Sequence, residues 1–377
     1  MKQSVRLGRI AGVQVGAHWS VAVILVLITE MLAVTVLPAA QRHQPAALYW
    51  AAAGAGAVLF LASLLAHELA HALVARHYGV PVRSITLWML GGVAELDADP
   101  PSAAADLRIA LAGPAASIAA GGLLFGAGVA ISAVRGPGVA VTAAMWLAVM
   151  NGILALFNLL PGAPLDGGRV LRALLWRHYG DRERAERGAA RAGQVLGTVI
   201  VGLGIAELLA LRSVGGLWLA LIGWFLITAA RAEEKAAAAK TALAGVRVGD
   251  VMTREPEVAG GWETVAGFAD RVAAWSRQDA FPVLGRGAAL IGVVLTSQLA
   301  RVPGADRSRV RLEQLALPVP PGYRAAPDDA AGQLLTRKPL GGEVVAVVIA
   351  DGLVVGLVTT SDLERALRWR TLAGAQP

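Results

Sequence analysis

The chain has 377 residues, of which 56% are hydrophobic and 16% are charged, and it contains no cysteine. This composition is too apolar for a soluble protein of this size and predicts a membrane protein with several spans. The lack of cysteine excludes disulfide bonds and cysteine ligands for a metal. The formal net charge of +7 lies mostly beside apolar runs, which favours the lipid bilayer and its anionic headgroups, and no nucleic acid, as the partner.

Six apolar runs reach the length of about 20 residues that a helix needs to cross a bilayer. They cover residues 16–37, 51–75, 104–134, 139–160, 192–211 and 214–230. We therefore expect six transmembrane helices.

Arginine placement predicts the orientation of these spans. Lys2, Arg6 and Arg9 precede the first run, and a second group of arginines lies between Arg169 and Arg191, after the fourth run. Cytoplasmic loops carry an excess of Lys and Arg, so both segments are expected in the cytoplasm. The chain is predicted to be a multi-pass protein of the cell membrane, with its N-terminus and C-terminal region cytoplasmic.

The second run contains the sequence His67-Glu68-Leu69-Ala70-His71. Residues four apart share one helix face, so His67 and His71 can hold one metal ion. Glu68 then lies beside the open coordination position, where a carboxylate can take a proton from metal-bound water. Ionisable groups in lipid cost about 2.5–3.5 kcal/mol each, so this motif inside an apolar run favours a catalytic metal over a packed helix interface.

A catalytic zinc needs a third protein ligand, and the sequence offers two candidates. His77 has the spacing of an extended HExxHxxGxxH motif, but Val74 stands where that motif has the glycine that bends the chain. On a continuous helix His77 lies about 9 Å along the axis from His71. Asp166 is favoured, because it lies in an irregular segment with two prolines and two glycines after the fourth run, where an acid indicates a functional site. Capping of the following helix is its alternative role.

Residues 82–96 are too few to span a bilayer and contain strand-forming residues around Gly91 and Gly92. They predict a β-hairpin that dips into the membrane. A catalytic metal in a membrane span implies an enzyme that cuts within the membrane. A substrate helix would then have to unwind before its peptide bond can be cut, and an exposed strand edge could hold the unwound chain by β-addition. A connector packed against other helices is the alternative interpretation of this segment.

The composition changes near Arg231. Residues 231–245 predict a charged helical linker, and residues 246–377 return to the composition of a soluble domain. Two similar segments, 290–299 and 354–363, each place a β-rich run and a Thr-Ser pair before a helix. This internal repeat predicts two packed α/β modules. The expected domains are a membrane domain at 1–230, the linker at 231–245 and a tandem module at 246–377.

With these motifs in place, residues 1–230 resemble the site-2 protease family of intramembrane metalloproteases. HELAH matches the HExxH motif of the family, and Pro164-Leu-Asp-Gly-Gly168 matches its LDG motif. The segments 112–115 and 91–94 add to the resemblance. It implies that His67, His71 and Asp166 hold zinc and that Glu68 is the general base. It also implies that Asn158 lies near the substrate backbone, although a helix-to-helix hydrogen bond would explain this residue as well.

The C-terminal repeats resemble a pair of CBS modules, which bind adenine nucleotides in many proteins. The second repeat has the GxxTxxD pattern as Gly356, Thr359 and Asp362, whereas the first repeat has Leu295 and Gln298 in place of Thr and Asp. The resemblance implies one adenine-nucleotide site at most. A structural or dimerising pair, able to join two copies of the chain, is the alternative.

The sequence thus predicts a multi-span α-helical membrane protein with a cytoplasmic α/β CBS pair. The expected function is a zinc endopeptidase that cuts in or near the transmembrane segment of another membrane protein, under CBS control. The family resemblance indicates a membrane-tethered transcriptional regulator or a signal-peptide remnant as substrate. The alternative is a nucleotide-regulated transporter or channel with intramembrane ion ligands, but the inverted repeats that it predicts are not evident in the sequence.

Overall fold

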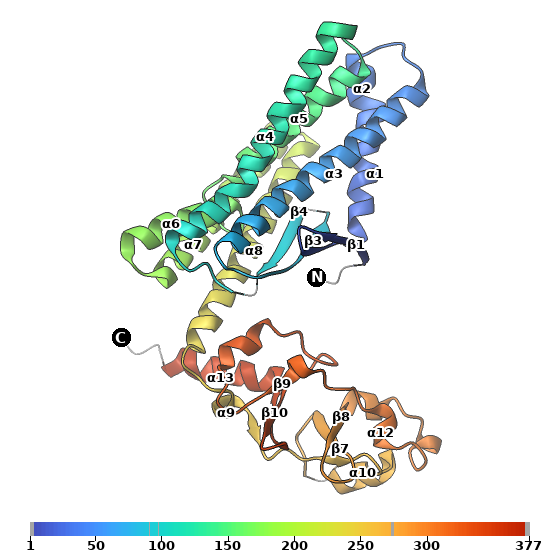
Figure 1. Cartoon of the computed structure of the whole chain (residues 1–377), viewed down its shortest axis with the longest axis vertical. Helices are drawn as coiled ribbons and strands as arrows, with labels where there is room; N and C mark the ends of the chain where they lie inside the picture. Colours follow the sequence, from blue (N-terminus) through green and yellow to red (C-terminus); the bar gives the residue numbers. More distant parts are fainter. Residues whose placement is uncertain (1–3, 90, 97, 273–274, 374–377) are drawn as a thin grey trace. The chain divides into compact units, whose positions relative to one another are not determined.

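The computed structural model describes residues 4–89, 91–96, 98–272 and 275–373. The chain forms two compact units, Met1–Lys235 and Ala236–Pro377. Helices dominate the first unit, and small mixed sheets dominate the second (Figure 1).

Six helices in the described part of the chain are long and apolar enough to cross a membrane. This count confirms the six expected spans. The first span combines α1 (Ser20–Met31), the π-helix η1 (Leu32–Val36) and α2 (Leu37–Ala40). The other spans are α3 (Ala46–His77), α4 (Ala103–Arg135), α5 (Val139–Asn158), α7 (Arg182–Leu211) and α8 (Val214–Ala242).

Short polar residues set several helix ends. The side chain of Ser102 accepts a hydrogen bond from Ala105 N and begins α4, and Asp181 begins α7 in the same way. Between the fourth and fifth spans, the first part of the arginine-rich segment forms the helix α6 (Asp166–Tyr179), which follows the irregular segment. Gly180, with φ of 70°, ends α6 in the left-handed conformation.

A four-stranded sheet belongs to the same unit as the spans. Its strands are β1 (Val5–Ile10), β2 (Val13–Ala17), β3 (Val82–Trp88) and β4 (Gly91–Leu96), in that order across the sheet. β3 and β4 form the expected antiparallel hairpin. The two N-terminal strands were not expected, and β2 pairs in parallel with β3. β4 is therefore one edge of the sheet.

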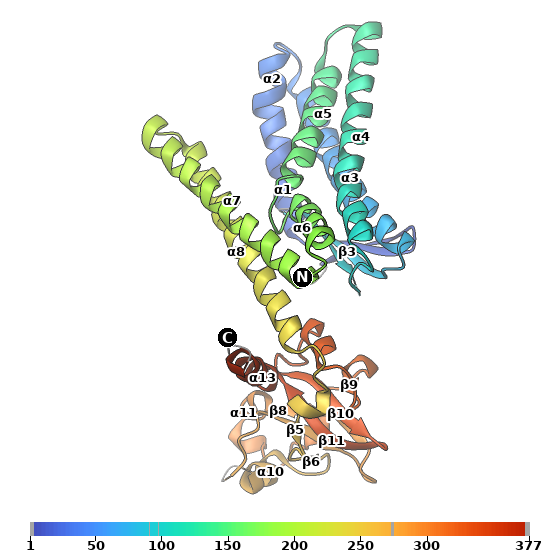
Figure 2. The same ribbon diagram turned by 90° about the vertical axis from the view of Figure 1, so that its left-hand side faces the viewer.

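The spans pack through small residues and leave large apolar side chains outward. α7 and α8 form a hairpin (Figure 2), in which Gly197 approaches Gly223 so closely that a Cβ on Gly197 would lie 2.7 Å from the carbonyl oxygen of Gly223. Side chains such as Leu123 and Leu209 are about three-quarters exposed, at 76% and 75%. Such surfaces suit contact with lipid tails.

The second unit contains two α/β modules. The first has the sheet β6 (Ala259–Gly260), β7 (Ala280–Leu284) and β8 (Leu290–Leu295), with α10 (Val265–Val272), α11 (Thr296–Ala300), η2 (Gly304–Asp306) and α12 (Leu312–Leu315). The second has the sheet β5 (Thr253–Arg254), β11 (Leu353–Thr359), β10 (Val344–Ala350) and β9 (Arg324–Ala325), with α9 (Val248–Val251), η3 (Pro321–Tyr323), η4 (Ala331–Thr336) and α13 (Thr360–Ala373).

Each module has its own apolar core, and a third cluster joins them. That shared cluster includes Val293 and Leu295 of the first module and Val344, Val347 and Leu357 of the second. The two repeats seen in the sequence are therefore two packed modules, as expected. The domain limits at 230 and 245 stay predictions.

Candidate metal centre

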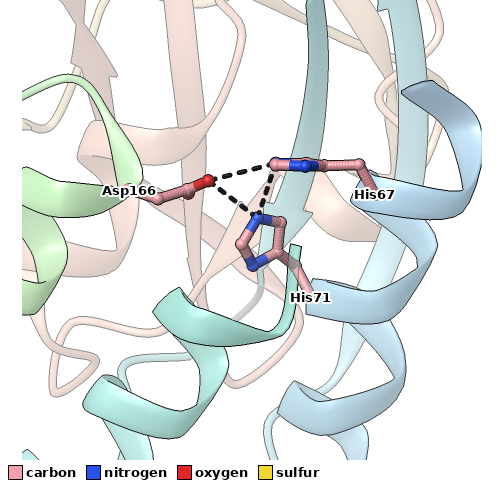
Figure 3. Close-up of side chains that lie close together, drawn as sticks. All are labelled: His67, His71 and Asp166. Carbon is pink, nitrogen blue, oxygen red and sulfur yellow. Dashed lines mark hydrogen bonds and ion pairs between the residues drawn. The ribbon is translucent and has the colours of Figure 1, made fainter. Parts of the chain in front are cut away.

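Three side chains from two helices converge in the membrane unit (Figure 3). His67 and His71 come from α3, and Asp166 is the first residue of α6. The Nε2 atoms of both histidines lie 3.1 Å from Asp166 Oδ2 and 3.2 Å from each other. The histidines are 2% and 5% exposed, so the cluster is buried. Among the described residues, these three form the group that could hold a metal ion.

The other nitrogen of each imidazole is held by helix α4. His67 Nδ1 lies 2.9 Å from Ser117 Oγ, and His71 Nδ1 lies 2.6 Å from the carbonyl oxygen of Ile109. The carbonyl can only accept, so Nδ1 of His71 carries the proton and Nε2 offers its lone pair to the cluster. Metal-binding histidines are commonly oriented in this way by a second hydrogen bond.

The spacing of the three atoms fits a zinc ion. Zinc bonds of about 2.1 Å in tetrahedral directions separate neighbouring ligand atoms by about 3.4 Å, close to the observed distances. Gly113 of α4 leaves the space that an ion needs. A Cβ at this position would lie 2.1 Å from His71 Nε2 and 2.5 Å from His67 Nε2.

The segment before α6 fixes the third candidate ligand. Glycines allow this segment to fold tightly on itself and against α7, because a Cβ on Gly168 would lie 2.3 Å from Ala163 N and one on Gly193 would lie 2.0 Å from the Ala163 carbonyl oxygen. Ala163 N also donates to the carbonyl oxygen of Ala189 on α7. The irregular backbone thus finds partners in the next span, as membrane depth requires. Asp166 also begins a helix, so the ligand and helix-start roles coincide.

Glu68, the residue after His67 on α3, lies against the sheet. A Cβ on Gly92 of β4 would lie 2.3 Å from Glu68 Cγ and 2.9 Å from Glu68 Oε1, so the strand passes directly against this carboxylate. The edge strand that was expected to hold a substrate is therefore beside the expected base. Gly91, at the start of β4, has φ of 144°, which favours glycine.

Two other polar residues lie outside the cluster. His77 is the exposed last residue of α3, and the helix runs without a bend through Val74, so the structure excludes His77 from the three-residue group. Asn158 ends α5 and donates from Nδ2 to the carbonyl oxygen of Leu154, one turn back on the same helix. Its expected role beside a substrate stays a prediction.

An ion pair links α6 to α4 beside the cluster. Arg172 donates through Nε and Nη2 to the two carboxylate oxygens of Asp106, at 2.9 and 2.7 Å. Asp106 is 1% exposed. Arg169 Nη2 lies 3.8 Å from the same carboxylate. A bidentate pair of this kind fixes the two helices in one register.

In the second unit a cavity of about 430 Å³ contains two of the three predicted nucleotide-binding residues, Thr359 and Asp362. Its other lining residues are Thr253, Arg277, Gln278, Asp279, Ala280, Glu343, Leu357, Ser361 and Arg365. Gly356 is not among them. A Cβ on Gly356 would lie 2.3 Å from the sulfur of Met252, so this glycine allows close packing beneath the sheet.

The carboxylate of Asp362 is engaged within the protein. It accepts from Thr359 N at 2.9 Å, from Thr359 Oγ1 at 2.7 Å and from Thr253 Oγ1 at 3.0 Å, and it pairs with Arg365. In the first module Gln298 accepts from Leu295 N at 3.0 Å, which reproduces only the helix-capping part of this arrangement. The first repeat has thus kept the fold of the motif without its carboxylate.

Several functional contacts were not found from the sequence. Ser117, Ile109 and Asp106 of α4 were unassigned, and Gly113 was noted only as part of the family resemblance. A signal was available, because residues 106, 109, 113 and 117 recur at helical spacing and bring an acid, a glycine and a serine onto one face of an apolar run. Their partner could not be read from that spacing.

The sequence comparisons agree with this site. The model for peptidase family M50 matches residues 55–139 and 130–200, the part of the chain that contains HELAH and Asp166. The Mycobacterium tuberculosis (strain H37Rv) protein Rip3, whose name describes a zinc metalloprotease, is 47% identical over 378 residues, covering 100% of this chain and 96% of its own length. The chain belongs to peptidase family M50. The expected site-2 type of metalloprotease is thereby confirmed.

Solved structures were also compared with this M50 peptidase. A site-2 protease from Methanocaldococcus jannaschii is 29% identical, with a TM-score of 0.42, and the match covers 61% of this chain and 94% of that chain. The CBS domain of a bacterial CNNM/CorC family Mg²⁺ transporter is 20% identical, with a TM-score of 0.30, over 36% of this chain and 82% of that chain. The M50 assignment rests on the sequence matches.

Proposed function

We propose that this M50 peptidase is an intramembrane zinc endopeptidase that hydrolyses a peptide bond in or near the transmembrane segment of a membrane protein. The convergence of His67, His71 and Asp166 at 3.1–3.2 Å within the membrane unit carries this proposal. The two histidines lie on a helix able to cross the bilayer, and the third side chain opens the helix that follows an irregular segment. M50 membership favours a peptidase over the transporter alternative.

His67, His71 and Asp166 would hold the zinc ion, with Gly113 leaving its space. A zinc ion in this position lowers the pKa of water and polarises a carbonyl group. Glu68 takes one proton from the attacking water as the oxygen forms its bond to the scissile carbon. The same carboxyl group then gives that proton to the amine nitrogen as the C–N bond breaks.

The edge of β4 provides a place for the substrate backbone. A transmembrane helix hides its peptide bonds in its own hydrogen bonds, so it has to unwind before cleavage. β4 pairs with β3 on one side, and its other side is an edge of the sheet. An unwound substrate that adds to this edge would run beside Gly92, and therefore beside Glu68. Asn158 and Gly91 are proposed to contact the same backbone.

Cleavage of a reporter with one transmembrane helix, in liposomes that contain the purified protein, tests the proposal. Glu68→Gln should reduce the rate by about 10²–10⁴-fold, because the general base is lost, while the zinc content stays unchanged. Asp166→Ala should lose both zinc and cleavage. Cleavage by Glu68→Gln at the wild-type rate would refute the assigned mechanism.

We further propose that the N-terminus and the C-terminal unit lie in the cytoplasm. The arginine bias supports this orientation, and the pairing of β2 with β3 requires both strands on one side of the membrane. Because the chain has no cysteine, single introduced thiols report on location without background. Ser4→Cys should react with an impermeant maleimide only after cells are opened, whereas Arg42→Cys should react in intact cells. The reverse labelling pattern would contradict the proposed orientation and place the N-terminus outside the cell.

The C-terminal modules are proposed to regulate cleavage through an adenine nucleotide in the cavity lined by Thr359 and Asp362. Calorimetric titration of the full chain with ATP and AMP tests binding, and Thr359→Val should weaken it. Heat changes that are the same for the wild type and the variant would count against this site. Association of two copies through these modules stays a prediction.

The substrate is proposed to be a membrane-tethered transcriptional regulator or a signal-peptide remnant. The position of His67 and His71 on a helix able to cross the bilayer supports a substrate that is already in the bilayer. Comparison of membrane-protein fragments in cells that carry the wild type or Glu68→Gln would identify it. A substrate accumulates in the variant and is shortened in the wild type.

A further inference from the structure

Arg169 poses an electrostatic problem for the proposed zinc site. It follows Asp166 by three residues on α6, and side chains three apart on a helix are neighbours. A guanidinium in that position normally pairs with the acid. Such a pair would engage carboxylate oxygens of Asp166 that a metal ion needs.

The structure shows a different pairing. Oδ2 of Asp166 faces the Nε2 atoms of His67 and His71, whereas Nη2 of Arg169 lies 3.8 Å from Oδ1 of Asp106 on α4. Asp106 also accepts both hydrogen bonds from Arg172. One buried carboxylate on α4 therefore attracts both arginines of α6.

Few other carboxylates can replace Asp106 as the partner of Arg169. The acids that act on this arginine electrostatically include Asp106, Asp166, Glu68 and Glu233, and of these Asp166 is the one on the same helix. The Arg169 side chain is only 23% exposed, and a mostly buried charge without a partner is costly, so this guanidinium requires a carboxylate nearby. If Asp106 lost its charge, the acid one turn away on the same helix would become the natural partner of Arg169.

We propose that Asp106 is a positioning residue that holds Arg169 away from Asp166 and so keeps Asp166 free to bind the metal. The inference rests on the proposed function, since it assigns a role toward the same zinc site. Its place on α4 is consistent, because Asp106 precedes Ile109, Gly113 and Ser117 at helical spacing. One helix face thus orients both histidines, leaves the space for the ion and withdraws the competing cation.

If Asp106 serves only as an anchor of α6 through Arg172, its loss should not weaken zinc binding more when Arg169 remains than when Arg172 remains. Two double variants separate the roles, since each removes one acid and one arginine. Asp106→Asn with Arg169→Gln leaves Arg172, which follows Asp166 by six residues and lies on another helix face. Asp106→Asn with Arg172→Gln leaves Arg169 beside Asp166. The two proteins have equal net charge and differ in which arginine remains.

The measurements are the zinc dissociation constant, from competition with a chelating dye, and the thermal unfolding midpoint of the full chain in detergent. We expect the variant that retains Arg172 to bind zinc within about threefold of the wild type. The variant that retains Arg169 should bind about 10–100-fold more weakly, the range found when partners of metal ligands are removed. Their unfolding midpoints without zinc should be similar.

Equal zinc affinities in the two variants, or weaker binding by the variant that retains Arg172, would overturn the proposal and leave Asp106 as an anchor. Failure of the wild type to bind zinc would instead refute the proposed function. The two failures are therefore distinguishable. As a further check, Arg169→Lys added to the Asp106→Asn and Arg172→Gln pair should keep zinc binding weak, because a cation remains beside Asp166.

Discussion

The candidate metal cluster and the C-terminal cavity each contain an aspartate near the start of a helix, but the two carboxylates have opposite surroundings. Asp166 faces two imidazole nitrogens, and the nearby arginines pair with Asp106 instead. Asp362 is saturated by two threonines and Arg365. An aspartate that protein groups already satisfy stabilises its own fold, whereas one that faces only other ligand atoms is available to an ion.

The largest effect that tests this contrast is expected at Gly113. Gly113→Ala places a methyl group where the ion would lie, 2.1 Å from His71 Nε2, so we expect zinc binding and cleavage to be abolished. Gly122→Ala is the matched control, because a Cβ at position 122 on the same helix meets nothing within 4 Å. The control should bind zinc normally. Metal analysis of the purified proteins measures both, and full zinc content in Gly113→Ala would place the ion elsewhere.

The next effect concerns Gly92, the residue of the edge strand β4 that lies against Glu68. Gly92→Ala brings a Cβ to 2.3 Å from Glu68 Cγ and must displace that side chain. Misplacement of a catalytic group by about 1 Å can cost about 100-fold in rate, so we expect kcat to fall by that factor with zinc content unchanged. Val93→Ala on the exposed side of β4 serves as the control. An unchanged kcat for Gly92→Ala would argue that Glu68 moves freely.

A smaller effect is expected at the saturated aspartate. Asp362→Ala leaves Thr253, Thr359 and Arg365 without their shared acceptor, which should destabilise the second module by about 1–3 kcal/mol. Gln298→Ala in the first module loses the capping bond from Leu295 N and a long hydrogen bond to the Leu315 carbonyl oxygen, and it should cost less because no charged group loses its partner. Hydrogen exchange of the amides in β10 and β11 reports the local free energy of opening. Equal protection from exchange in Asp362→Ala and the wild type would show that Asp362 does not stabilise the second module.

The smallest effect concerns Glu343 beside the cavity. Burial, and then the negative charge of Asp279, raises the pKa of Glu343 above its ordinary value. The folded state therefore favours the protonated form of Glu343. The module keeps its full stability at a pH below the pKa of this group in the unfolded chain, and it loses stability as the pH rises from that pKa through the higher pKa of the folded state. Glu343→Gln should make the module more stable than the wild type at neutral pH and equal to it in acid. Urea unfolding across this pH range measures the difference.

The sequence predicts the membrane spans and the cluster because both depend on local patterns. Hydropathy over about 20 residues identifies a span without knowledge of its neighbours, and two histidines four apart on a helix must share a face. Asp166 was found for a similar reason, since prolines and glycines at membrane depth mark an irregular segment. These features need no knowledge of tertiary contacts.

Other features depend on contacts between distant segments. Strands β1 and β2 escaped prediction because both are short, and the pairing of β2 with β3, in which Gln14 lies opposite Ser84, joins segments far apart in the sequence. Asp106 and Arg172 carry no sequence mark that pairs them, although their hydrogen bonds are short. A helix after Asp166 was considered only as an alternative, because α6 is too short to appear as a span in the hydropathy pattern.

The parallel pairing of β2 with β3 has a consequence for biogenesis. The chain between the two strands contains α1 and α3, both of which are spans. β3 can therefore meet β2 only after both helices have crossed the bilayer and returned the chain to its starting side. The β4 edge beside Glu68, where we propose that the substrate backbone binds, forms on that completed pair, so it cannot assemble while only the first span has been inserted. Insertion of the second span is thus a precondition for assembling the place where substrates would be held.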